Sequence, residues 1–202
     1  MRRVARGAGW SGGWLQRARR CPSPNVGPRP PAERICLVLL HSISLPPGSY
    51  GGDAIERLFT NRLDWEAHPY YDTLRGLHVS AHFLVRRTGA LVQFVDCDDR
   101  AWHAGESVWR NRAGCNDYSV GVELEGLEGD AFEPAQYASL VGLLVDLRRR
   151  YPIDAVVGHE HVAPGRKQDP GTGFDWCQLM AALGWPTRYF PVTVLTPGSS
   201  KD

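Results

Sequence analysis

The longest uninterrupted apolar segment of the chain is only six residues long, from Ile35 to Leu40. A helix that crosses a bilayer needs about 20 such residues, so no segment is expected to span a membrane. Six apolar residues followed by the polar His41 are instead typical of a buried strand. The chain is therefore expected to fold around an internal sheet, and its 202 residues suffice for about one domain.

Turn signals and the spacing of apolar residues predict the other elements. Residues 79–85 and 90–95 flank Arg87-Thr88-Gly89 and are expected to pair as a β-hairpin. Asp53, with Glu56 three residues later, is typical of a capping box at the start of a short helix. Further strands are expected at 119–126 and 155–157, and further helices at 134–151 and 174–183.

The order of these elements predicts the fold class. Strands and helices are mixed without strict βαβ alternation, so we expect a single α/β domain with a central mixed sheet flanked by helices. This domain is expected to cover residues 13–185. Residues 1–12 are basic and contain no acid, so we expect a flexible N-terminal extension there, and residues 186–202 are expected to form a C-terminal tail.

Charge and cysteine content restrict the partners and the compartment. The chain has 23 Lys and Arg residues against 22 Asp and Glu residues, a net charge of +1, which provides no overall field for nucleic acid or an anionic membrane. The five cysteines are odd in number, scattered and without a CxxC pair, which argues against a disulfide framework. Because no apolar stretch of signal-peptide length follows the basic N-terminus, we expect a cytoplasmic protein.

Two histidines and an aspartate are candidate ligands of a metal ion. His41 and His159 follow strands, and Asp169 lies in the loop beyond the second strand. Two His nitrogens and a carboxylate meet the needs of a catalytic zinc, which keeps one position open for water. His78 and His82 are less suitable, because residues four apart on a strand are separated by about 13 Å. Histidines at strand ends are often core or surface residues, and spacing alone leaves that alternative open.

A carboxylate and a lysine could complete a hydrolytic site. Glu123 lies on the face of its strand opposite Val120 and Val122, where an acid faces either solvent or a site. Lys167 precedes Asp169 by two residues and projects to the same side if the chain is extended there. A zinc hydrolase needs a metal to acidify water, a carboxylate to take its proton and a cation to stabilise the oxyanion. Both residues could also be solvated charges.

Four motifs of the chain resemble a known family. They are residues 41–48 (HSISLPPG), 100–105 (RAWHAG), 115–126 (CNDYSVGVELEG) and 158–171 (GHEHVAPGRKQDPG). In this order they resemble the cytoplasmic 1,6-anhydro-N-acetylmuramyl-L-alanine amidases of peptidoglycan recycling, the AmpD type. The resemblance covers roughly residues 13 to 185.

The resemblance implies a zinc enzyme that acts on anhydro-muropeptides. By position, His41, His159 and Asp169 match the three Zn²⁺ ligands, Glu123 matches the glutamate that activates water, and Lys167 matches the lysine placed against the scissile carbonyl. The bond expected to be cleaved joins the lactyl group of N-acetylmuramic acid to L-Ala. The implied fold is the mixed α/β architecture that these amidases share with peptidoglycan recognition proteins.

Four further residues are expected to bind substrate, and one position departs from the ligand pattern. Ser42 stands near the expected sugar site, where close relatives usually have Asn. The sugar cleft could be lined by Tyr70, Trp102 and His103. Trp102 could equally be a core residue. Arg112 could face the acidic stem peptide or be solvated. His161 stands where the common pattern has Asp and could compete as a ligand.

Two other functions are open at this point. A non-catalytic receptor of peptidoglycan fragments is one alternative, but such receptors typically lose a zinc ligand, whereas all three candidate ligands are present here. The second alternative is a lytic amidase that acts on the intact cell wall.

Overall fold

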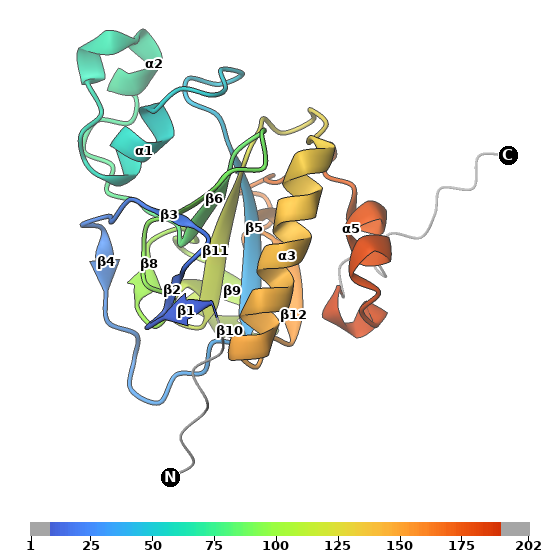
Figure 1. The fold of residues 1–202 in the computed structure, drawn as a ribbon. Coiled ribbons are helices and arrows are strands. Elements are labelled where there is room, and N and C mark those ends of the chain that lie inside the picture. The colour runs from blue at the N-terminus through green and yellow to red at the C-terminus, as the bar shows by residue number, and fades with distance from the viewer. Residues whose placement is uncertain (1–8, 191–202) are drawn as a thin grey trace, which may run out of the picture.

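A six-stranded sheet forms the centre of the computed structural model, which describes residues 9–190 (Figure 1). Its strand order is β12-β5-β11-β6-β7-β3. All neighbouring strands are parallel except β6 and β7, which form the predicted hairpin, so the sheet is mixed as expected. The strands are β3 (Arg19–Arg20), β5 (Leu37–Ile43), β6 (Phe83–Val85), β7 (Leu91–Gln93), β11 (Ser119–Glu125) and β12 (Ala155–Gly158).

The apolar run at residues 35–40 lies largely in β5, one of the two central strands of the sheet. Strand β5 pairs with β11 over seven residues in register, with Leu37 opposite Ser119 and His41 opposite Glu123. All seven residues of β11 are buried, as are the first five of β5. The strand continues to Ile43, beyond the predicted end at His41, because its pairing with β11 continues to Glu125.

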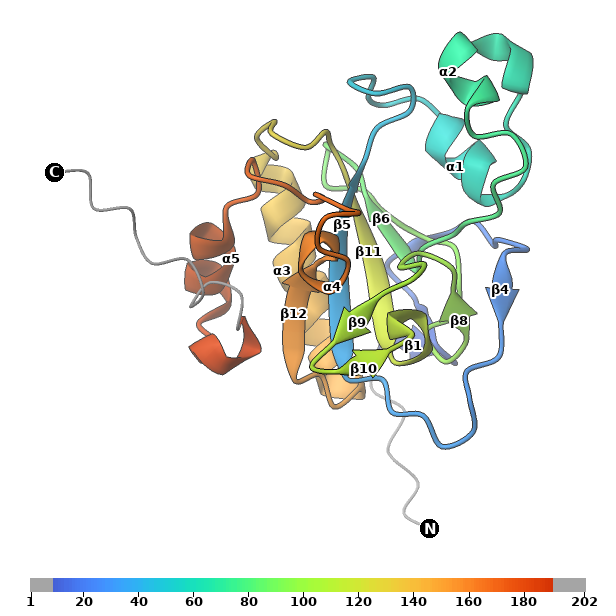
Figure 2. The same ribbon diagram turned by 180° about the vertical axis from the view of Figure 1, so that it is seen from behind.

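One face of the sheet is covered by two helices. Helix α3 (Pro134–Arg150) packs its apolar stripe on this face, and α5 (Trp176–Leu183) lies beside α3 (Figures 1 and 2). Alternate residues of the central strands, Val38 and Leu40 on β5 and Val120 and Val122 on β11, join α3 in the largest core cluster. The odd-numbered residues of the two strands therefore face the other side, where His41 and Glu123 lie.

Short elements cover that other side and the upper edge of the sheet. Figure 2 shows β9, β10 and α4 in front of the central strands on the face turned away from α3. The segment 44–80, with α1 and α2, lies above the sheet on the side of β6 (Figure 1). The remaining elements are β1 (Trp10–Ser11), β2 (Trp14–Leu15), β4 (Val26–Gly27), α1 (Ala54–Phe59), α2 (Pro69–Asp72), β8 (Arg100–Ala101), β9 (Val108–Trp109), β10 (Arg112–Ala113) and α4 (His159–Val162), with single 3₁₀ turns at Trp65–Ala67, Cys115–Asp117 and Thr187–Tyr189.

One predicted helix cap and one predicted helix start differ from the structure. Helix α1 begins after Asp53 as expected, but the predicted capping box is absent, because the Asp53 side chain makes no capping hydrogen bond. Asp53 pairs instead with Arg57, at 2.7 Å. Helix α5 begins at Trp176 rather than at residue 174, because Asp175 caps it by accepting a hydrogen bond from the Gln178 N–H.

The folded part extends beyond both predicted boundaries. Trp10 forms β1 with Ser11 and is buried in the core, although the extension was expected to end at residue 12. At the other end, Phe190 is buried in the same core, five residues after the predicted end at 185. Residues 1–8 of the predicted extension and residues 191–202 of the predicted tail lie outside the described residues. No helix within residues 9–190 is long and apolar enough to cross a membrane.

Candidate active site and metal centre

The three predicted metal ligands, although far apart in the sequence, meet at the carboxyl ends of the parallel strands. His41 belongs to β5, His159 opens α4 directly after β12, and Asp169 lies in the loop that follows α4. The Nδ1 atoms of the two histidines are 3.0 Å apart, and the Asp169 Oδ2 atom lies 3.0 Å from His41 Nδ1 and 3.1 Å from His159 Nδ1. All three side chains are buried. Three ligand atoms thus converge on one point.

The protonation of these groups suits a divalent cation. The Nε2 atom of His159 lies 3.0 Å from the Ala104 carbonyl oxygen, which can only accept, so Nε2 carries the proton and the neutral ring has its lone pair at Nδ1. That lone pair faces the Asp169 carboxylate, an arrangement that is repulsive unless a cation lies between them. Burial lowers the pKa of His41, which favours its neutral form.

The Asp169 carboxylate is held in its ionised form. Burial alone would raise the pKa of Asp169, but the contacts with the His159 and His41 rings lower it below its ordinary value when a proton, or a metal ion in its place, lies between Nδ1 and the carboxylate. Two neutral imidazoles and one carboxylate form a donor set that zinc accepts, with a fourth position for water. The residues therefore fit the Zn²⁺ ion that the resemblance implies.

Glu123 lies beside this centre and has the properties of a proton acceptor. It is opposite His41 in the β5–β11 register, and its side chain is buried. Its Oε2 atom is buried and has no hydrogen-bond partner among the described residues. Burial, together with the negative charge of Asp169, raises the pKa of Glu123 well above its usual value, while Lys167 acts in the opposite direction. A carboxylate with a raised pKa and a free oxygen is suited to general base catalysis.

A pocket of about 220 Å³ connects these groups. Its polar side is formed by the three candidate ligands together with Glu123 and Lys167. Its apolar side comes largely from the helical segment 44–80, with Leu58, Phe59, Leu74, Leu77 and Val79. The exposed Lys167 side chain can reach a bound molecule without crossing the core. The pocket therefore suits a ligand with both polar and apolar parts.

Three of the four predicted substrate residues line this pocket. They are Ser42, Tyr70 and Trp102. Arg112 is not among the lining residues: it lies on β10, forms an ion pair with Glu33 and packs its guanidinium over the Tyr118 ring, 3.9 Å from the ring centre. His161 does not join the ligand atoms either, because its Nδ1 atom accepts a hydrogen bond from the Gly158 N–H at 3.0 Å.

Two residues of the site, Asn116 and His103, make contacts that the sequence does not predict. The His103 Nδ1 atom lies 2.9 Å from the Nε2 atom of His41, and His103 also lines the pocket. The Asn116 Oδ1 atom accepts hydrogen bonds from the backbone N–H groups of His103 and Ala104. The only signal for either residue was its place in a family motif, because neither contact is local in the sequence.

Comparisons with known proteins identify the family. The profile of the N-acetylmuramoyl-L-alanine amidase family matches residues 32–172. The 1,6-anhydro-N-acetylmuramyl-L-alanine amidase AmpD of Citrobacter freundii is 46% identical over 192 residues, which cover 94% of this chain and 96% of that protein. The chain belongs to the N-acetylmuramoyl-L-alanine amidase family. Its three candidate zinc ligands and Glu123 all fall within the matched residues.

Solved structures agree with this assignment. A crystal structure of a selenomethionine derivative of AmpD superposes on the amidase with a TM-score of 0.83, at 48% identity over 86% of this chain and 98% of that one. The Escherichia coli amidase AmiD, solved with the substrate anhydro-N-acetylmuramic acid-L-Ala-D-γ-Glu-L-Lys, has 30% identity and a TM-score of 0.54 over 76% of this chain and 60% of that one. A Drosophila peptidoglycan recognition protein, at 16% identity and a TM-score of 0.56 over 82% of this chain and 86% of that one, shares the fold, as predicted.

Proposed function

We propose that this amidase is a zinc-dependent enzyme of peptidoglycan recycling. In this proposal it hydrolyses the amide that joins the lactyl group of 1,6-anhydro-N-acetylmuramic acid to L-Ala in soluble muropeptides. The observation that carries the proposal is the buried set of His41, His159 and Asp169 in one pocket with Glu123, whose Oε2 atom has no hydrogen-bond partner within residues 9–190. The similarity to AmpD along nearly the whole chain supports the choice of substrate.

The side chains of the pocket account for hydrolysis as follows. A bound zinc ion supplies a Lewis acid that polarises the carbonyl and acidifies water. Glu123 takes the proton of the attacking water as the new C–O bond forms, and returns it to the amide nitrogen as the C–N bond breaks. The Lys167 ammonium stabilises the negative charge on the carbonyl oxygen in the transition state. The products are a lactyl carboxylate on the sugar and a peptide with a free amino group.

Substrate contacts complete the proposal. Ser42, Tyr70 and Trp102 line the pocket, and we assign them to contacts with the anhydro-sugar and its neighbouring amide. A contact between Arg112 and the acidic stem peptide requires that Arg112 exchange Glu33 for a peptide carboxylate, since Arg112 is already paired. The cytoplasmic location belongs to the proposal as well, and all five cysteines are free thiols, as a reducing compartment requires.

A comparison of two substrates tests this proposal. The zinc-loaded protein is incubated either with soluble anhydro-N-acetylmuramyl tripeptide or with intact sacculi, and the released sugar and peptide are quantified by mass spectrometry. We expect the soluble fragment to be cleaved far faster than the polymer. Faster release from sacculi would make the protein a lytic amidase, and tight binding of the fragment without cleavage would make it a receptor.

A further inference from the structure

His103 connects a candidate zinc ligand to the central sheet. Its Nδ1 atom lies 2.9 Å from His41 Nε2, and its Nε2 atom lies 3.3 Å from the Ser119 hydroxyl. The Ser119 hydroxyl in turn donates to the Cys115 carbonyl oxygen at 2.6 Å. A continuous chain of polar contacts therefore runs from His41 through His103 and Ser119 to the backbone.

The direction of every hydrogen bond between His41 and Ser119 follows from the last acceptor, the Cys115 carbonyl. The Cys115 carbonyl can only accept, so it takes the single proton of the Ser119 hydroxyl, which can then only accept from His103 Nε2. A neutral His103 with its proton on Nε2 has its lone pair on Nδ1, so His41 must donate from Nε2. The lone pair of His41 is then at Nδ1, the atom that faces Asp169.

The hydrogen bonds of this network require a neutral His103, which accepts at Nδ1 from His41 and donates from Nε2 to Ser119. A protonated His103 would donate from both nitrogens and force the His41 proton onto Nδ1, which removes the lone pair that a metal needs. A divalent ion at the centre would oppose that state further, because it repels a cationic ring.

The second histidine ligand is oriented by the next residue of the same segment. The Ala104 carbonyl accepts from His159 Nε2 at 3.0 Å and from Arg166 Nη2 at 2.7 Å. The N–H groups of His103 and Ala104 both donate to Asn116 Oδ1, at 3.1 and 2.8 Å, which fixes the backbone of the segment. The dipeptide His103-Ala104 thus contacts the Nε2 atom of both candidate histidine ligands.

Strand β11 is shaped to accommodate the His103 ring. A Cβ atom at Gly121 would lie 2.5 Å from His103 Cγ, closer than any real contact, so only glycine leaves room for the imidazole. Ser119, Gly121 and Glu123 alternate on one face of the strand. They respectively accept the His103 hydrogen bond, make space for its ring and supply the proposed general base.

We propose that His103 is a positioning residue which, with Ser119, holds His41 in the tautomer with its proton on Nε2 and its lone pair at Nδ1 directed to the metal. This inference rests on the proposed zinc site and adds the residues that orient it. Loss of such an outer contact typically weakens metal affinity about 10- to 100-fold.

The first test reads the tautomer without metal or substrate. Long-range ¹H–¹⁵N spectra of the histidine side chains are recorded on the zinc-free protein at pH 7.5. We expect His41 to be protonated at Nε2 in the wild type and in His103→Asn, whose side-chain oxygen can accept in place of Nδ1. A mixture of tautomers is expected in His103→Leu and, to a smaller extent, in Ser119→Ala. A wild-type His41 protonated at Nδ1 would overturn the proposal.

The second test measures zinc affinity by competition with a chromophoric chelator. His103→Leu and Gly121→Ala are expected to bind zinc about 10- to 100-fold more weakly than the wild type, and His103→Asn to recover most of the loss. His161→Ala is the matched control, because His161 lies next to the site but does not belong to the hydrogen-bond network of His41, His103 and Ser119. This variant should bind zinc as tightly as the wild type.

The two tests separate this inference from the proposed function. Wild-type zinc affinity in folded His103→Leu would refute the role of His103, even if the zinc mechanism is correct. If the wild type itself binds no zinc, the proposed function fails, while the spectra still decide the tautomer. Should His103→Leu not fold by circular dichroism, the conservative pair His103→Asn and Ser119→Ala decides the question.

Discussion

Glu123 and Glu125 are two residues apart on β11, but their surroundings give the two carboxylates different chemistry. The Oε2 atom of Glu123 has no partner among the described residues, and burial raises its pKa. Glu125 instead accepts hydrogen bonds from Arg86 Nη1 and from the backbone N–H groups of Gly51 and Arg87, at 2.9, 2.7 and 3.1 Å. The first carboxylate is available for proton transfer, whereas the second ties loops to the sheet.

We therefore expect Glu123→Gln and Glu125→Gln to fail in different ways. Glu123→Gln should retain one zinc per chain and lose about 10²- to 10⁴-fold in kcat, the usual contribution of a general base. Glu125→Gln should lower the midpoint of urea unfolding and keep kcat within a few-fold of the wild type. Zinc is measured by elemental analysis and kcat by product chromatography. Equal losses of kcat in the two folded variants would refute the assignment of the base.

Lys167 supports a second prediction at this scale. It lines the pocket and is placed by sequence two residues from Asp169. A cation that acts on the developing oxyanion works mainly in the transition state, so Lys167→Ala should lower kcat and kcat/KM together by about 10²- to 10³-fold. KM and zinc content should hardly change. A raised KM with a normal kcat would instead make Lys167 an anchor for a substrate carboxylate.

Among the helices and strands, those whose formation depends on residues close in the sequence are the ones that the sequence predicts. The period of apolar residues after Pro134 predicted α3, and Arg87-Thr88-Gly89 predicted the β6–β7 hairpin, in which Gly89 adopts the left-handed conformation at φ 82°. The capping box at Asp53 failed because its second member, Glu56, is engaged by arginines from elsewhere in the chain. The contact of His103 with His41 was likewise invisible, since it depends on how the segment packs across β11.

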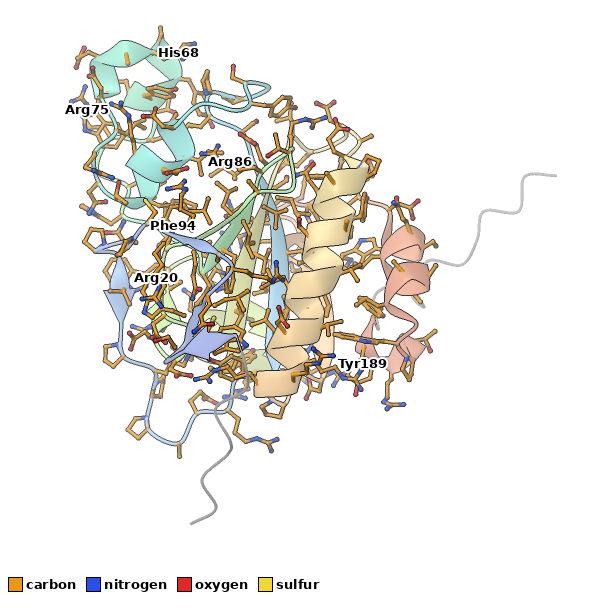
Figure 3. The ribbon with its side chains drawn as sticks, in the orientation of Figure 1. Arg20, His68, Arg75, Arg86, Phe94 and Tyr189 are labelled. Carbon is orange, nitrogen blue, oxygen red and sulfur yellow. The ribbon has the colours of Figure 1, made fainter. Side chains whose placement is uncertain are left out.

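Glu56 of α1 forms ion pairs with two arginines of the sheet region. Its Oε1 atom accepts a hydrogen bond from Nη2 of Arg19, on the edge strand β3, at 2.5 Å. It accepts a second from Nη2 of Arg86, directly after β6, at 2.7 Å. Arg86, labelled in Figure 3, lies between α1 and the sheet and also binds Glu125. Because α1 supplies Leu58 and Phe59 to the pocket wall, this network also positions the apolar side of the site.

This network predicts a pH-dependent contribution to stability. Burial raises the pKa of Glu56, but the hydrogen bonds and charges of Arg19 and Arg86 outweigh it and lower the pKa below its ordinary value. A depressed folded-state pKa stabilises the protein above the unfolded pKa of about 4.3, and this stabilisation disappears as the pH falls through the folded-state value. Glu56→Gln should therefore cost roughly 1–2 kcal/mol at pH 7 and progressively less below pH 4.5.

Urea unfolding at pH 7, 5 and 3.5 checks this expectation. Asp53→Asn is the control on the same helix, because the ion pair of Asp53 with Arg57 is exposed and should contribute little at any pH. A destabilisation by Glu56→Gln that stays constant from pH 7 to pH 3.5 would show that the loss is one of packing, without an electrostatic part.

Over the whole molecule, contacts between distant parts of the chain close the fold around the site. His41 and His159 are 118 residues apart, and the ligand set joins β5, α4 and the loop after α4. On the face of the sheet that α3 covers, Arg148 donates a hydrogen bond to the Tyr189 hydroxyl at 3.0 Å, which holds the last described turn on the helix. Figure 3 labels Tyr189 near the C-terminal end of α3. The candidate metal centre is thus one of the long-range connections of the domain.

Zinc should for this reason stabilise the entire fold and not only the pocket. The unfolded chain does not hold the three ligands together, so zinc at 100 times its Kd is expected to add about 2.7 kcal/mol to the free energy of unfolding. For a domain of this size that gain corresponds to a rise in Tm of roughly 5–10 °C. Differential scanning calorimetry of chelator-treated protein, with and without added zinc, measures it.

Two variants show whether the rise in Tm comes from this centre. Asp169→Asn removes the only anionic ligand of the set and should abolish the dependence of Tm on zinc, whereas His161→Ala should preserve it. Because surface histidines can also bind zinc weakly, a rise in Tm that persists in Asp169→Asn would place the stabilising ion elsewhere. A Tm independent of zinc in an active wild-type enzyme would contradict the zinc mechanism as a whole.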